Sequence, residues 1–149
     1  KVNSYPNDAI NNGEEVSETF ITVGALAPKY GSDMVASYSN YGTINVDVFA
    51  PGSAIYSTVP ESKYKAMQGT SMASPAVAGI AAVLRSQYPN LTAAEVKQII
   101  LSSGVPIKTK VLVAGNPDNV KEFNTLSTSG KIANLYNALI IADRYSKQK

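Results

Sequence analysis

The sequence predicts a chain of mixed α and β structure, because apolar residues follow two different patterns along it. Short runs rich in β-branched residues, at 20–23 and 46–49, are typical of buried strands. Stretches after residue 70 are rich in alanine or carry apolar residues three and four positions apart, as helices do. With 149 residues, 44% hydrophobic and 16% charged, the chain has the composition of a globular domain rather than a disordered segment.

The first half is expected to hold strands and connections. Gly24 is expected to end the first strand, and Pro51 with Gly52 to end the second. Alternating residues at 55–59, stopped by Pro60, predict a strand that forms a hairpin with 63–67. The expected elements are a polar surface loop over 1–18 and strands with connections over 20–68, including a long connection at 27–43.

The second half is expected to hold three helices. Residues 71–86 are apolar nearly all round, which predicts a buried helix with Pro75 near its start. Thr92 and Glu95 form a capping-box pattern in front of a helix over 93–103. A third helix is expected over 135–145, and 107–130 is expected to be irregular with some strand.

Composition excludes several kinds of chemistry. The chain has no cysteine, so it has no disulfide, thiol nucleophile or thiolate metal site. It has no histidine, so it cannot supply the commonest general base by itself. The net charge is only +2, and the basic residues are spread along the sequence, which argues against nucleic acid as a partner. No apolar run approaches the roughly 18 residues of a membrane span, so no membrane partner is expected.

Ser71 stands between Gly69 and the expected alanine-rich helix, and two interpretations of it remain open. Serine is a good helix N-cap, which is a purely structural role. A nucleophilic serine at the same place would put a developing oxyanion beside the unpaired N–H groups and the positive dipole end of the helix.

The sequence around Ser71 resembles the nucleophile motif of the subtilisin family of serine peptidases. It reads Gly-Thr-Ser-Met-Ala-Ser-Pro at 69–75 and Ala-Val-Ala-Gly at 76–79, where the family more often has histidine in place of Ala76. Further blocks resemble the family in the same order, at 20–25, 37–42, 46–52, 88–92 and 130–134.

The resemblance implies an α/β fold class, a subtilisin-like parallel sheet flanked by helices, of which residues 1–149 form only the C-terminal portion. The family's triad Asp and His and its oxyanion Asn are then expected upstream of Lys1, in a missing N-terminal half that is a partner of this chain. Asp47 is not expected to replace the triad Asp, because it lies in a strand block. The resemblance favours a secreted or cell-envelope location and a polypeptide substrate.

The site residues that the resemblance implies are few. Ser71 is the catalytic nucleophile, and its backbone N–H contributes to the oxyanion site. Tyr5 and Pro6 resemble a pair that borders the substrate pocket and is often cis in the family, although a trans bond in a terminal segment is the alternative. The substrate-binding residues expected from these motifs are Tyr5, Pro6, Gly69, Thr70 and Met72.

No metal or other cofactor is expected in this chain, although the resemblance allows calcium in the parent enzyme. Acidic residues near the N-terminus offer candidate ligands without EF-hand spacing, and a solvated acidic loop is the favoured interpretation. These residues are Asp8, Glu14, Glu15 and Glu18.

Other short patterns are weaker. Ser62 and Lys65 fit S-x-x-K, 69–73 nearly fit a nucleophile elbow, and Asn90 begins a glycosylation sequon whose favoured interpretation is a capping turn.

Two functions stay open: a piece of a serine endopeptidase that is inactive alone, or a non-catalytic binding module that kept the fold. For an isolated piece, we expect an exposed apolar surface or self-association.

Overall fold

A four-stranded sheet organises the chain in a computed structural model that describes Gly13 and residues 15–147. Strands β1 (Val23–Leu26), β2 (Val48–Pro51) and β8 (Lys131–Ile132) run parallel, and β5 (Val105–Pro106) joins β8 in the antiparallel direction. The order is β1-β2-β8-β5, with β1 at one edge. The expected parallel sheet is therefore present, with one antiparallel strand added.

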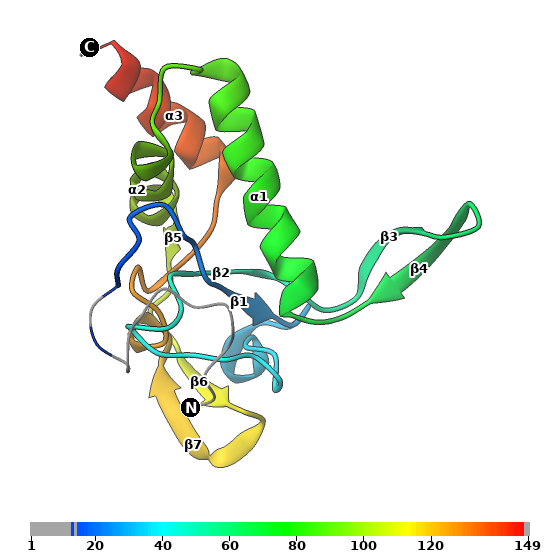
Figure 1. The fold of residues 1–149 in the computed structure, drawn as a ribbon. Coiled ribbons are helices and arrows are strands. Elements are labelled where there is room, and N and C mark those ends of the chain that lie inside the picture. Colours follow the sequence, from blue (N-terminus) through cyan, green and yellow to red (C-terminus); the bar gives the residue numbers. More distant parts are fainter. Residues whose placement is uncertain (1–12, 14, 148–149) are drawn as a thin grey trace.

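Three helices pack together beside this sheet (Figure 1). Helix α1 (Thr70–Gln87) contacts β1 and β2, and α2 (Ala93–Ser103) and α3 (Leu135–Ser146) pack against it and each other. The capping box is confirmed, because Thr92 accepts from the Glu95 N–H at 3.2 Å and Glu95 accepts from the Thr92 N–H at 2.8 Å. At the other end of α2, Lys131 Nζ donates to the Ser102 carbonyl at 2.6 Å, which satisfies one of the helix's last carbonyls.

Strands β1 and β2 each contribute to two separate cores, because successive side chains point to opposite faces. On β2, Val48 and Ala50 join the core beneath the helices, while Phe49 joins a second core. Phe49 packs there against Phe123, with 5.2 Å between ring centroids. The second core lies beside the hairpin of β6 (Lys110–Val113) and β7 (Asn116–Glu122), and includes the short 3-10 helix η3 (Phe123–Thr125).

A second hairpin of β3 (Ile55–Val59) and β4 (Lys63–Met67) extends away from the body and leads directly into α1 (Figure 1). This confirms the pairing of 55–59 with 63–67. Tyr56 and Tyr64 stack on it with 5.7 Å between ring centroids and stay largely exposed. The long connection at 27–43, which follows β1, contains the short 3-10 helix η2 (Gly31–Asp33).

Gly24 was expected to end the first strand, and this expectation is wrong. Strand β1 starts at Val23 and passes through Gly24. A Cβ at Gly24 would lie 2.4 Å from the Phe49 ring, so glycine serves close packing between neighbouring strands rather than a turn.

The expectation that α1 is buried is also wrong for this chain. Only Ala73, Val77 and Leu84 of its 18 residues are buried. The helix runs over 70–87, close to the expected 71–86, but most of its apolar surface faces solvent. Pro75 lies inside the helix rather than in its first turn.

Candidate active site

Ser71 lies in the first turn of α1 with its side chain exposed. Gly69 is the N-cap residue, and its φ of 148° lies in the region that favours glycine. The Gly69 carbonyl accepts from the N–H groups of Met72 at 3.0 Å and Ala73 at 3.4 Å. Ser71 is thus not the N-cap, so the purely structural interpretation of this serine is wrong.

Pro75 adds a local feature to the same turn. In an unbroken helix, the N–H of residue 75 would bond to the carbonyl of residue 71. Proline has no N–H, so it removes that helical partner from the Ser71 carbonyl. On its N-terminal side, the turn that carries Ser71 is held by hydrogen bonds to the Gly69 carbonyl.

Ser71 shares one side of α1 with an exposed surface of small and apolar residues. A helix advances about 100° per residue, so positions three, four, seven and eleven residues apart lie on one side. Pro75, Ala78 and Ala82 are exposed at such positions relative to Ser71, and Val83 is 37% exposed beside them. We call this surface the α1 outer face; it consists of Pro75, Ala76, Ala78, Gly79, Ala82 and Val83.

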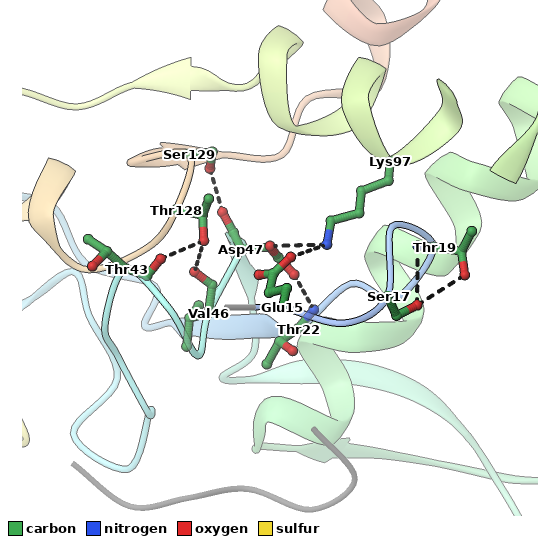
Figure 2. Close-up of polar contacts among 10 residues, drawn as sticks. All are labelled: Glu15, Ser17, Thr19, Thr22, Thr43, Val46, Asp47, Lys97, Thr128 and Ser129. Atoms are coloured by element: carbon green, nitrogen blue, oxygen red, sulfur yellow. Dashed lines mark hydrogen bonds and ion pairs between the residues drawn. The ribbon is translucent and has the colours of Figure 1, made fainter. Parts of the chain in front are cut away.

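Three charged side chains, Lys97, Glu15 and Asp47, form a largely buried group (Figure 2). Lys97 Nζ lies 2.8 Å from Glu15 Oε2 and 3.5 Å from Asp47 Oδ1. Asp47 Oδ2 accepts from the Thr22 N–H at 2.8 Å. Burial raises the pKa of Asp47 from 3.8 to about 6, against the lowering effects of the Thr22 hydrogen bond and of Lys97.

This group corrects the expectation of a solvated acidic loop, because Glu15 is half-buried and paired with Lys97. Glu18 is exposed, while Asp8 and Glu14 lie outside the described residues. Within the described part of the chain, no three His, Cys, Asp or Glu side chains form a group that could hold a metal ion. Asp47 is a member of this buried charged group, through its ion pair with Lys97.

The expected site residues fall into two sets. Gly69, Thr70, Ser71 and Met72 are together at the start of α1. Tyr5 and Pro6 lie outside the described residues, so their role and the geometry of their peptide bond stay predictions.

Two of the weaker patterns are resolved by local structure. Ser62 lies in the exposed turn of the β3–β4 hairpin, not at the helix start that a catalytic S-x-x-K serine requires. Thr92 caps α2, which bears out the structural interpretation of the segment at Asn90.

Sequence reasoning missed two residues that the structure brings into prominence. Lys97 interrupts the apolar stripe of α2, and a lysine within such a stripe is a signal of a buried ion pair. Tyr38 donates to the Gly52 carbonyl at 2.8 Å, a contact between distant segments that no local pattern indicates.

Comparison with known proteins agrees with this arrangement. The model of the subtilase family, Peptidase_S8, matches residues 3–136. Subtilisin DY of Bacillus licheniformis is 42% identical over 86 residues, which cover 58% of this chain and 30% of that protein. Thermitase of Thermoactinomyces vulgaris is 54% identical over 63 residues, covering 42% of this chain and 22% of thermitase.

A wider match comes from the subtilase-type proteinase isp6 of Schizosaccharomyces pombe, 37% identical over 125 residues, covering 82% of this chain and 26% of isp6. These regions amount to less than a third of each relative. In the part of the chain that the structure describes, no helix has the length and hydrophobicity to cross a membrane.

Solved structures show the same fold. A chain of the subtilase cytotoxin SubAB assembly superposes with a TM-score of 0.64 at 27% identity, covering 85% of this chain and 37% of that one. The A-subunit of the AB5 toxin from E. coli superposes with a TM-score of 0.62 at 28% identity, covering 82% and 37%. Together with the family match over most of the sequence, these similarities establish that the chain belongs to the subtilase family of serine peptidases.

Proposed function

We propose that Ser71 is the nucleophile of a secreted or cell-envelope serine endopeptidase, which this chain forms together with an N-terminal half of the same domain. The observation that carries the proposal is the exposed serine in the first turn of α1, on the same side as the α1 outer face. The N-terminal half would supply the histidine that the 149 residues lack and would cover this apolar face.

The chemistry follows from the position of Ser71. Its Oγ attacks the carbonyl carbon of a peptide bond while its proton passes to the histidine of the other half. The carbonyl oxygen becomes an oxyanion, which the Ser71 N–H and the positive end of α1 stabilise. The C–N bond then breaks as the amine takes the proton, and water releases the acyl group from Oγ. Gly69, Thr70 and Met72 contact the polypeptide substrate, and Tyr5 and Pro6 border the substrate pocket.

The 149-residue chain alone is expected to have no peptidase activity. A serine hydroxyl without a base is a weak nucleophile, and in this family type losing His costs nearly as much as losing the whole triad. No cofactor takes part in the share of the reaction that this chain carries, and calcium would serve only the complete enzyme.

Turnover of a fluorogenic peptide tests the proposal. The complete protein is expected to cleave the peptide, the 149-residue chain to leave it intact, and Ser71→Ala to abolish cleavage by the complete protein. Ser86→Ala is the matched control, because it changes an exposed serine in the last turn of the same helix. Peptide binding without cleavage by the complete protein would favour the non-catalytic binding module instead.

A further inference from the structure

The Gly52 carbonyl, just after β2, accepts two hydrogen bonds from different segments. The Gly69 N–H donates to it at 2.8 Å, and the Tyr38 hydroxyl donates to it at 2.8 Å. A carbonyl oxygen has two lone pairs, so this acceptor is fully used. The turn before Ser71 and the side chain of Tyr38 therefore meet at a single oxygen atom.

The packing around Gly52 leaves little room for this oxygen to move. A Cβ at Gly52 would lie 2.6 Å from the Ala25 Cβ and 2.9 Å from the Gly69 carbonyl oxygen. Gly52 is buried, and its own N–H donates to the Leu26 carbonyl at 3.0 Å. The backbone at Gly52 is thus pressed between β1 and the turn at Gly69.

The Ser53 hydroxyl extends this set of hydrogen bonds. Its Oγ lies 2.6 Å from the Tyr38 hydroxyl oxygen. A phenol has one hydrogen, and Tyr38 uses it toward Gly52, so Ser53 is the donor in this contact. The order is Ser53 to Tyr38 to Gly52, and hydrogen bonds in such a chain strengthen one another.

Gly69 transmits this restraint to the nucleophile motif. Its N–H is held by Gly52, and its carbonyl accepts from Met72 and Ala73 across the first turn of α1. Ser71 lies between these bonded residues, so a shift of the Gly69 peptide moves the Ser71 N–H and hydroxyl with it.

We propose that Tyr38 is a positioning residue for Ser71, acting through the Gly52 carbonyl and the Gly69 peptide. The inference rests on the proposed function of Ser71. It assigns the hydroxyl, not the ring, as the group that matters, because only the hydroxyl reaches Gly52. Restraining the nucleophile favours the geometry of attack, so the effect belongs in kcat more than in KM.

Tyr38→Phe tests the proposal by removing the hydroxyl and keeping the ring. In the complete protein, kcat and the rate of phosphonylation by a fluorophosphonate are expected to fall roughly 3- to 10-fold, the effect of one hydrogen bond, with a smaller change in KM. Ser53→Ala is expected to act in the same direction and more weakly. Tyr30→Phe is the matched control, because this tyrosine is 99% exposed.

A second measurement does not depend on activity. In the 149-residue chain, amide hydrogen exchange at Gly69 is expected to be faster in Tyr38→Phe than in the wild type and unchanged in Tyr30→Phe. Unchanged exchange at Gly69, or a Tyr38→Phe enzyme with wild-type kcat, would overturn the role of Tyr38. If Ser71→Ala retained full activity, the proposed function itself would fail. The two failures are therefore distinguishable.

Discussion

Lys97 Nζ on α2 lies 2.8 Å from Glu15 Oε2, although 82 residues separate the two along the chain. Asp47 Oδ1, at the entry to β2, lies 3.5 Å from the same ammonium. Two carboxyl groups thus share one buried ammonium (Figure 2). The group joins the N-terminal segment, the sheet and α2, and it balances its charges only when one carboxyl group holds a proton.

The first prediction concerns the ammonium. Lys97→Met keeps the length of the side chain and leaves Asp47 and Glu15 without their cation. The free energy of unfolding at neutral pH is expected to fall by about 3 kcal/mol, as for other buried pairs that lose one partner. Urea unfolding of Lys110→Met provides the control, because Lys110 and Glu122 form an exposed pair at 3.9 Å. That loss is expected to stay below about 1 kcal/mol, and equal losses in the two variants would contradict the prediction.

The second prediction concerns pH. Burial raises the pKa of Asp47 from 3.8 to about 6, so the folded chain binds this proton more tightly than the unfolded chain. The stabilisation from Asp47 is therefore complete below about pH 4 and is lost as the pH rises through about 6, a change of the order of 3 kcal/mol.

Asp47→Asn is expected to remove this pH dependence, because the amide stays neutral and keeps an oxygen for the Thr22 N–H. Urea unfolding of both proteins at about pH 4.5 and 7.5 gives the comparison. Wild type and Asp47→Asn with the same loss of stability over this range would show that Asp47 titrates normally.

The third prediction concerns the α1 outer face. We expect the 149-residue chain to form dimers or larger species at tens of micromolar, because exposed apolar faces associate. Ala82→Lys places a charge on this face and is expected to shift the chain toward monomer in sedimentation velocity, while Gln98→Lys on α2 does not. A wild-type monomer that fails to bind the apolar dye ANS would contradict the expectation.

The fourth prediction concerns the turn between β6 and β7. Ala114 and Gly115 both have positive φ, of 55° and 66°. Such turns favour asparagine followed by glycine, so Ala114→Asn is expected to raise the free energy of unfolding by about 0.5–1 kcal/mol. Gly115→Ala is expected to destabilise, since its Cβ would also meet Ser37 at 3.0 Å. Thermal unfolding measures both, and a destabilised Ala114→Asn would refute the turn assignment.

Local patterns in the sequence predict the elements that local physics forms. The capping box at Thr92 and Glu95 identifies the start of α2, and alternation with a proline stop identifies the β3–β4 hairpin. The meeting of Gly24 with Phe49, and of Lys97 with Glu15, depends on residues far apart in the sequence, so no local pattern contains it.

The candidate active site was likewise predictable from the sequence only in part. The residues 69–75 identify Ser71 because the motif is contiguous, and the structure brings it to the exposed first turn of α1. An exposed apolar surface was expected for an isolated piece, but the pattern did not locate it on α1, because an alanine-rich apolar helix has the same sequence whether its covering surface belongs to this chain or to another part of the domain.

The role of Ser71 is tested most directly by covalent labelling. The complete protein is treated with a fluorophosphonate, digested, and the modified residue located by mass spectrometry. We expect an adduct on Ser71 in the complete protein, none in the 149-residue chain alone, and none after Ser71→Ala. Peptide cleavage by a complete protein whose fluorophosphonate adduct lies on another residue, with Ser71 unmodified, would contradict it.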